Sequence, residues 1–225
     1  MQNRFISIEF CKNINLQNFI EIYNRLSYPN CREECFMDQE YPENKQFYTS
    51  SELREDGFSY YKINRMVKDG RLERLTRSTY RNTSYKGDES DFSIATVYAP
   101  KGVICMLSAA RYYNLTTFLP DSVDIAIERS MKVSTVPEWP SLNIWYFPKV
   151  RYETGAVSEG DFRIYEVEKT VADILYYRNK IGIEETREIL KNYLARKERN
   201  LVRLHRFADL LGCGKILSTY MEVLL

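Results

Sequence analysis

The order of turn and helix-cap residues in one short segment constrains the fold of this chain more than any other feature. Ser50 or Ser51 can begin a short helix, and Gly57 can make the turn that follows it. Ser59 can then cap a second helix, which Gly70 would end. This spacing predicts two short helices joined by a tight turn, the arrangement of a helix-turn-helix.

The second predicted helix has an apolar face and a polar face. The apolar face consists of Tyr60, Ile63, Met66 and Val67. On the other face, Lys62 and Lys68 can neutralise phosphates, whereas Asn64 and Arg65 have the hydrogen-bonding groups that match adenine and guanine edges. We therefore predict a DNA-reading surface made of Ser59, Tyr61, Lys62, Asn64, Arg65 and Lys68.

The residues after Gly70 alternate between apolar and basic, as the two strands of a hairpin do. Leu72, Leu75 and Tyr80 would cover the helices. The basic side chains would face a DNA backbone or enter a minor groove. The candidate DNA contacts of this predicted wing are Arg71, Arg74, Arg77 and Arg81.

The charges of the chain are unevenly distributed. The formal net charge is only +1, yet seven Lys or Arg residues lie between Ser59 and Arg81, against two acidic residues. A charge run by itself is usually a solvated surface. Here the run coincides with a predicted helix-turn-helix and a basic hairpin, so we expect a localised anionic partner, duplex DNA.

The same segment resembles the N-terminal winged helix of the abortive-infection AbiEi antitoxin family. The resemblance rests on residues in a fixed order and spacing: Glu52, Leu53, Gly57, Phe58, Ser59, Ile63, Met66, Val67, Gly70, Leu72, Arg74, Leu75, Arg77 and Tyr80. It continues in residues 102–110, 115–120 and 168–173, and so covers about residues 47–225. Ser78 stands where the wing tip of this family often has glycine, and a positive φ is costly for serine.

The resemblance implies a regulator rather than an enzyme. Members of the family are antitoxins of type IV toxin-antitoxin operons that act in phage defence. They repress their own promoter through the winged helix and counteract a nucleotidyltransferase toxin. The expected partners are thus double-stranded promoter DNA with a repeat operator, a second copy of the chain on that DNA, and the toxin, whose direct contact with this chain is left open. The expected location is the cytoplasm.

Two stretches rich in polar residues, 28–46 and 82–91, are predicted linkers. The predicted domains are an N-terminal extension, 1–46, with a helix near 15–27; a winged helix-turn-helix, 47–82; and a C-terminal α/β antitoxin domain, 92–225. The first helix would pack against 47–82, unless the residues before Met37 are a loosely attached extension. The predicted fold class is α+β, with an N-terminal winged helix-turn-helix followed by a larger mixed domain that has a small sheet and many helices.

The larger domain shows a change of hydrophobic period along the chain. Residues 92–114 predict two helices, because Pro100 forbids one continuous helix. Residues 123–127 and 143–147 predict strands, and 154–157 with 162–165 predict a hairpin. From Glu168 onward the period is helical.

Signals for membrane insertion, metal binding and catalysis are weak. No apolar run reaches the roughly 20 residues of a membrane span. Five cysteines, an odd number, fit neither a disulfide framework nor a zinc cage, and the single histidine, His205, has no nucleophile motif beside it. We therefore expect no metal, no cofactor and no catalytic residue.

Two other functions remain alternatives to the regulator. The carboxylates of Glu166, Glu168 and Asp173 near Lys169 could serve a metal-dependent nuclease. The simpler interpretation is that Lys169 and Asp173 form an i,i+4 ion pair and that Glu168 favours a helix N-terminus. The winged helix could also bind protein. Metal-dependent DNA cleavage would select the nuclease, and the absence of salt-sensitive DNA binding would select the protein-interaction module.

Overall fold

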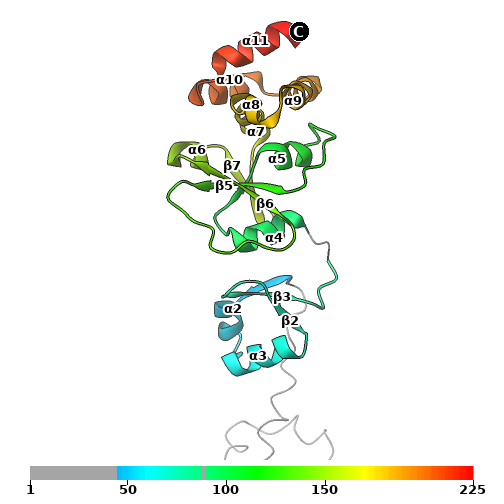
Figure 1. Ribbon diagram of the computed structural model, residues 1–225, viewed down its shortest axis with the longest axis vertical. Helices are drawn as coiled ribbons and strands as arrows, with labels where there is room; N and C mark the ends of the chain where they lie inside the picture. The colour runs from blue at the N-terminus through cyan, green and yellow to red at the C-terminus, as the bar shows by residue number, and fades with distance from the viewer. Residues whose placement is uncertain (1–44, 88–89, 225) are drawn as a thin grey trace, which may run out of the picture. The chain divides into compact units, whose positions relative to one another are not determined.

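The computed structural model describes residues 45–87 and 90–224, which contain ten helices and eight strands in two sheets (Figure 1). The chain is thus a mixed α and β protein, as predicted. The helix predicted near residues 15–27 lies outside the described residues. Among the described helices, none combines the length and the apolar character that crossing a membrane would require.

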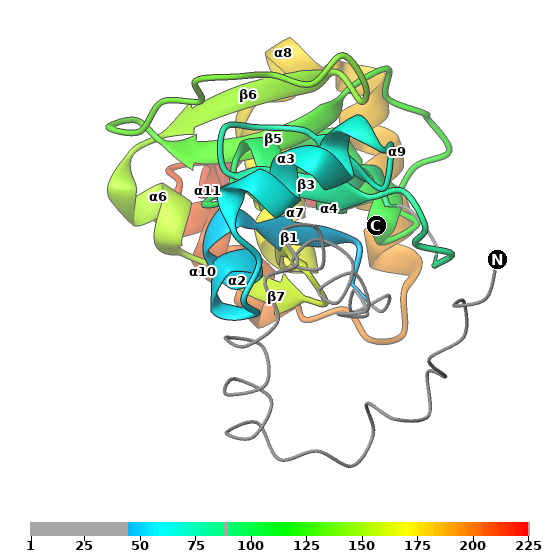
Figure 2. The same ribbon diagram turned by 90° about the horizontal axis from the view of Figure 1, so that it is seen from below.

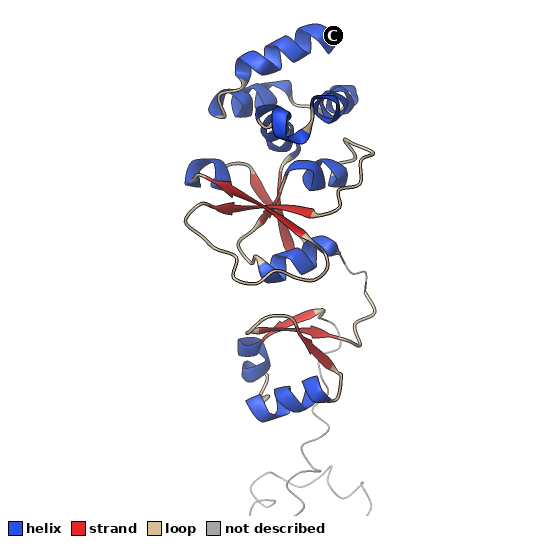
Figure 3. Cartoon of the chain, in the orientation of Figure 1, coloured by secondary structure: helices blue, strands red, loops and turns tan. Residues whose placement is uncertain are grey.

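Residues 45–83, which we refer to as the head, contain two helices and a three-stranded antiparallel sheet. The elements are β1 (Phe47–Thr49), α2 (Ser50–Glu55), α3 (Tyr60–Lys68), β2 (Leu72–Arg74) and β3 (Thr79–Asn82). The strand order is β1-β3-β2, so β3 pairs with strands on both sides (Figure 3). The two helices and the hairpin were predicted, whereas β1 was not. Three residues are too few to show an alternating pattern.

The core of the head is made by apolar side chains from both helices and all three strands. Its fully or nearly fully buried members are Tyr48, Leu53, Phe58, Ile63, Leu72 and Tyr80. The prediction that Tyr60 belongs to the buried face of α3 was wrong, since 56% of its surface is exposed. Tyr60 is the first residue of α3, and its ring lies 5.2 Å from the guanidinium of Arg54 in α2 instead of entering the core.

Helix α2 begins with a capping box, Thr49-x-x-Glu52, which was not predicted from the sequence. The hydroxyl of Thr49 accepts a hydrogen bond from the backbone N–H of Glu52 at 3.2 Å, and the carboxylate of Glu52 accepts one from the backbone N–H of Thr49 at 2.8 Å. Lys45 also pairs with Glu52. This ion pair and the bonds from Thr49 hold the pKa of Glu52 below its ordinary value.

Replacing Thr49 with alanine should therefore destabilise α2 by about 1 kcal/mol at neutral pH. The amides of α2 should exchange with deuterium about fivefold faster, while Thr49→Ser should exchange as the wild type does. Because the pKa of Glu52 is lowered on folding, its contribution is present at neutral pH and is lost as the pH falls through that lowered pKa. Of the bonds lost in Thr49→Ala, only the one from the hydroxyl to the Glu52 carboxylate depends on that charge, so the difference from wild type should shrink only in part in acid. A Thr49→Ala protein whose α2 amides exchange as in the wild type at neutral pH would contradict the capping box.

The predicted linker at 82–91 begins later than expected. Asn82 is buried in β3, and its backbone N–H donates to the carbonyl of Gln46 at 2.8 Å. The hydroxyl of Thr83 lies within hydrogen-bonding distance of the carbonyls of Gly70 (2.7 Å) and Arg71 (2.9 Å). These two polar residues belong to the head, because Asn82 bonds to backbone groups just before β1 and Thr83 bonds to backbone groups just after α3.

Residues 90–224, which we refer to as the body, contain a five-stranded mixed sheet. Its strands are β4 (Val103–Ile104), β5 (Val123–Glu128), β6 (Leu142–Phe147), β7 (Ala156–Glu159) and β8 (Phe162–Tyr165), in the order β6-β5-β4-β8-β7. Strands β5 and β6 run parallel, side by side, as Figure 2 shows, and β4 is parallel to β8. The pairs β4–β5 and β7–β8 are antiparallel. The predicted strands are present, and the two-residue β4 is an addition to them.

Helices cover both faces of this sheet. They are α4 (Asp91–Tyr98), α5 (Met106–Tyr112), α6 (Lys149–Glu153), α7 (Val167–Tyr176), α8 (Arg178–Ile181), α9 (Ile183–Ala195), α10 (Leu201–Leu210) and α11 (Gly214–Leu224). In Figure 1, α4 lies on one side of the sheet, and α5, α6 and α7 lie on the other. Ile125 and Ile127 pack in the cluster with residues of α4, whereas Ala126 packs in the cluster with α7, as alternation along a strand requires.

Helix α7 is the central helix of the body. Every residue from Glu168 to Leu175 is buried. Helices α5, α9, α10 and α11 contact α7, and residues of α7 share one core cluster with residues of the sheet. A helix covered on all sides has no solvent-facing stripe for its polar residues. Its charged side chains must therefore find partners inside the protein.

Helix α5 obtains its N-terminal cap from a distant strand. Cys105 occupies the cap position without a side-chain bond, and Met106 has a positive φ of 47°. The carboxylate of Asp124 in β5 accepts hydrogen bonds from the backbone N–H groups of Leu107 (3.1 Å) and Ser108 (3.4 Å), and another from the indole N–H of Trp145 (2.9 Å). One buried carboxylate thus joins α5 to β5 and β6.

Candidate nucleic-acid interface

The N-terminal cap and the buried residues of α3 determine which side of this helix faces solvent. The hydroxyl of Ser59 accepts a hydrogen bond from the backbone N–H of Lys62 at 3.3 Å, as predicted for the cap. Ile63 is completely buried, and Met66 and Val67 are half-buried. These contacts fix the helix about its own axis, so the residues on the opposite side face solvent.

The predicted reading residues of α3 mostly lie on that exposed side. Tyr61 has 71% of its surface exposed, and Asn64, Arg65 and Lys68 are also exposed. Lys62 is half-buried, with its ammonium 5.8 Å from the ring of Phe58. Arg65 lies 3.9 Å from the carboxylate of Asp69, a distance at which an exposed pair contributes little and is easily exchanged for another anion.

The predicted basic residues of the hairpin are in three different situations. Arg71 and Arg77 are exposed. Arg74 is exposed as well, but its guanidinium donates hydrogen bonds to backbone carbonyls of the hairpin loop. Arg81 is half-buried, with its guanidinium 3.6 Å from the carboxylate of Glu73. Helix α3 contacts β2, so the structure places both groups of predicted residues in one small unit.

The hairpin loop closes without a left-handed residue at its tip. Among residues 45–87 and 90–224, the non-glycine residues with positive φ are Met106 and Asn114, which both lie in the body. Ser78 therefore avoids the strain that a glycine-type turn would have imposed on it. The turn is instead held by the hydroxyl of Thr76, which accepts from the backbone N–H groups of Ser78 (3.4 Å) and Thr79 (3.1 Å).

One exposed cation of the head was not predicted from the sequence. Arg54 lies in α2, before the basic run that begins at Ser59, and its guanidinium lies 5.2 Å from the exposed ring of Tyr60. No ion pair of Arg54 is found with the residues that the structure describes. The signal that could have revealed it is spacing, because Gly57 returns the chain and brings the end of α2 beside the start of α3.

The carboxylates that suggested a nuclease each have a partner within the body. The predicted ion pair of Lys169 with Asp173 is present, and both side chains are fully buried. The same carboxylate accepts two hydrogen bonds from the guanidinium of Arg151, at 3.0 and 2.7 Å. Glu166 forms an ion pair with Arg203 at 2.5 Å, and Glu168 accepts a hydrogen bond from the hydroxyl of Tyr193 at 3.1 Å.

Aromatic rings enclose this buried ionic cluster. The guanidinium of Arg151 lies between 4.2 and 4.7 Å from the rings of Phe147, Tyr176 and Tyr177. The ammonium of Lys169 lies 4.2 Å from the ring of Tyr165, and burial lowers the pKa of this lysine. Within residues 45–87 and 90–224, no three His, Cys, Asp or Glu side chains are arranged to hold a metal ion. The geometry of the cluster supports a role in packing of the body.

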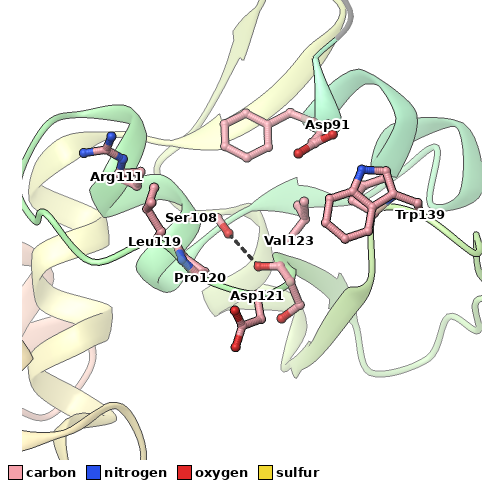
Figure 4. A pocket seen from close by; sticks show the side chains of 11 residues that line it. Asp91, Ser108, Arg111, Leu119, Pro120, Asp121, Val123 and Trp139 are labelled. Atoms are coloured by element: carbon pink, nitrogen blue, oxygen red, sulfur yellow. Dashed lines mark hydrogen bonds between the residues drawn. The ribbon is translucent and has the colours of Figure 1, made fainter.

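A surface pocket of the body offers no better site for chemistry (Figure 4). Its lining includes Ser108, Arg111, Leu119 and Trp139, from α5 and from the loops that flank β5. The hydroxyl of Ser108 lies 3.4 Å from the carbonyl of Ser122 and accepts from the backbone N–H of Asp124 at 2.8 Å. This hydroxyl is thus engaged in the fold, and we assign no ligand to the pocket. His205 lies exposed in α10.

Comparison with known protein families connects the head to a function. Residues 45–83 match the family described as transcriptional regulator, AbiEi antitoxin. A comparison with curated proteins found no match. The matched residues begin just before β1 and end just after β3, so they span the head from one end to the other. The comparison therefore confirms, for the head, the resemblance recognised from the sequence: residues 45–83 are similar to the AbiEi antitoxin transcriptional regulators.

Proposed function

We propose that the head is a winged helix-turn-helix that binds duplex DNA at the promoter of the chain's own operon. In this proposal α2 and α3 are the helix-turn-helix, and the hairpin of β2 and β3 is the wing. The match to antitoxin transcriptional regulators supports this assignment. The compact order of two helices and a hairpin supports it independently, since a helix presented in this way fits a major groove.

The observation that carries the proposal is the division of α3 into two faces. Ile63 anchors the helix in the core, and Asn64, Arg65 and Lys68 stand exposed beside it. An amide and a guanidinium can each make paired hydrogen bonds with a base edge, and the ammonium can neutralise a phosphate. A purely structural surface helix has no need of base-reading groups next to a basic hairpin.

The regulatory role follows from the proposed DNA binding and the family. The chain acts in the cytoplasm as the antitoxin of a type IV toxin-antitoxin operon, represses that operon and counteracts a nucleotidyltransferase toxin. The predicted C-terminal domain, residues 92–225, supplies the activity against the toxin or self-association. One reading helix covers only a few base pairs, so two copies would occupy a repeat operator to reach the discrimination that a repressor needs.

The salt dependence of binding tests the proposal directly. If about six basic groups of each head meet phosphates, the logarithm of affinity should fall against the logarithm of salt concentration with a slope near −5 for one head. Two heads on one site should give about twice that slope. The measurement is fluorescence anisotropy of a labelled duplex from the region upstream of the gene, titrated across a salt series.

A head that binds protein would behave differently. Rim charges at a protein interface are few, and salt hardly weakens the burial of apolar surface. A slope near zero on the upstream duplex would therefore contradict DNA binding. The matched control is Arg206→Ala, which removes an exposed arginine of α10 in the body and should leave the slope unchanged.

A further inference from the structure

The tip of the hairpin is folded by its own side chains. The backbone N–H groups of Leu75 and Thr76 donate to the carbonyl of Thr79, at 3.1 and 3.2 Å. The hydroxyl of Thr76 accepts from the backbone of Ser78 and Thr79. These bonds close the loop between β2 and β3 without glycine, and they leave the carbonyl oxygens of residues 76 and 77 available to another donor.

Arg74 is that donor. Its Nε donates to the carbonyl of Thr76 at 3.3 Å, and its Nη2 donates to the carbonyl of Arg77 at 3.0 Å. The guanidinium also lies 6.0 Å from the ring of Tyr80, a residue of the head's core. A planar guanidinium that spans two carbonyls and rests beside a fixed ring holds the loop in one shape.

The side chain of Arg77, unlike that of Arg74, is not bonded to the loop. Its side chain is exposed at the tip, and within residues 45–87 and 90–224 it forms no hydrogen bond, ion pair or ring contact. Its neighbours in the loop, Thr76 and Ser78, have short side chains. Arg81 lies beside Glu73 and is half-buried, and the exposed Arg71 precedes β2 at the end of the hairpin opposite the tip. The hairpin thus presents one arginine at a narrow tip.

We infer that Arg77 is the wing residue that enters a DNA minor groove, and that Arg74 is a positioning residue that holds the tip so that Arg77 can do so. This inference rests on the proposed function of the head. A minor groove is about 6 Å wide, which admits a single side chain better than a cluster. Narrow A·T-rich grooves have an enhanced negative potential that attracts arginine, and the amino group of guanine obstructs the groove of G·C pairs.

Three labelled duplexes of alternating sequence separate minor-groove binding from other contacts. They contain A·T pairs, G·C pairs, or inosine·C pairs, which present the major-groove acceptors of G·C but lack the amino group in the minor groove. The full-length protein should bind the A·T and inosine·C duplexes about fivefold more tightly than the G·C duplex. Arg77→Ala should remove this preference and reduce the salt slope by about one per head.

A double-mutant cycle tests whether Arg74 acts through Arg77. Arg74→Lys keeps the charge but cannot span two carbonyls, so it should reduce the A·T preference about as much as Arg77→Ala does. In the Arg77→Ala background, Arg74→Lys should cause no further loss, because the contact that it positions is already absent. Thr76→Ala, which removes the hydroxyl that accepts from the backbone of Ser78 and Thr79 without changing charge, should reduce the preference in the same way.

Three results would overturn the inference. One is an Arg74→Lys protein that keeps the preference while Arg74→Gln loses it, since Arg74 would then contact a phosphate itself. Another is a multiplicative loss in the double variant, which would show that the two arginines act independently. The third is an inosine·C duplex bound as weakly as G·C. If none of the duplexes is bound in a salt-dependent way, the proposed function itself fails, which is a distinct outcome.

Discussion

Replacing Asp173 with asparagine should lower the free energy of unfolding of the body by about 3–5 kcal/mol. Asparagine has nearly the shape of aspartate, so the change removes charge and leaves volume almost the same. The side chains of Arg151 and Lys169 are 10% and 0% exposed, and both pair with this one carboxylate. Without it, two buried cations would face each other among aromatic rings with no anion between them.

Lys169→Met is the matched control for this prediction. Methionine fills a similar volume, and the remaining pair of Arg151 and Asp173 stays neutral and hydrogen bonded. The loss should be less than about 1.5 kcal/mol, because the desolvation cost of the lysine disappears together with its attraction to the carboxylate. Urea unfolding followed by tryptophan fluorescence reports on the body, since both tryptophans of the chain, Trp139 and Trp145, lie there. A smaller loss in Asp173→Asn than in Lys169→Met would contradict our view of the cluster.

Replacing Asn64 or Arg65 with alanine should weaken binding to the operator by about 1–3 kcal/mol each, which is roughly 5- to 150-fold in affinity. Both side chains are exposed on α3, next to the buried Ile63, and both have the paired groups that a base edge requires. The two variants should differ in their salt dependence. Asn64 has no charge, so its loss should leave the salt slope unchanged, whereas loss of Arg65 can reduce it.

A base contact can be distinguished from a phosphate contact by comparing the affinity for specific DNA with the affinity for non-specific DNA. The comparison uses the upstream duplex and a scrambled duplex of the same composition, titrated at one salt concentration by anisotropy. Asn64→Ala should weaken only the first, while Lys68→Ala should weaken both to a similar extent. If Asn64→Ala bound both duplexes as the wild type does, the reading surface would have to be placed elsewhere on the head.

In the head, features that depend on neighbouring residues of the sequence were predicted, whereas features that depend on the depth of the core or on distant strands were not. Ser59 and Gly70 were recognised as cap and end of α3, because a cap bonds to a backbone group only three residues away and a glycine adopts a positive φ by itself. Tyr60 was misplaced because helical spacing predicts a side of the helix, not the depth of the core at each end. Strand β1 was missed because it is short and its pairing with β3 joins residues 30 or more positions apart.

The division between sequence and structure is clearest in the charged residues. The sequence by itself determined where the basic residues lie along the chain, that they alternate with apolar residues in a hairpin, and which family the head resembles, since all of these depend on residues near one another. Only the tertiary structure decided that Asp124 caps α5, that Asp173 pairs with Arg151, and that Arg74 holds the loop from which Arg77 extends. The physical reason is that a buried charge or backbone group bonds to whatever partner folding brings within about 3 Å, and that partner has no fixed spacing in the chain.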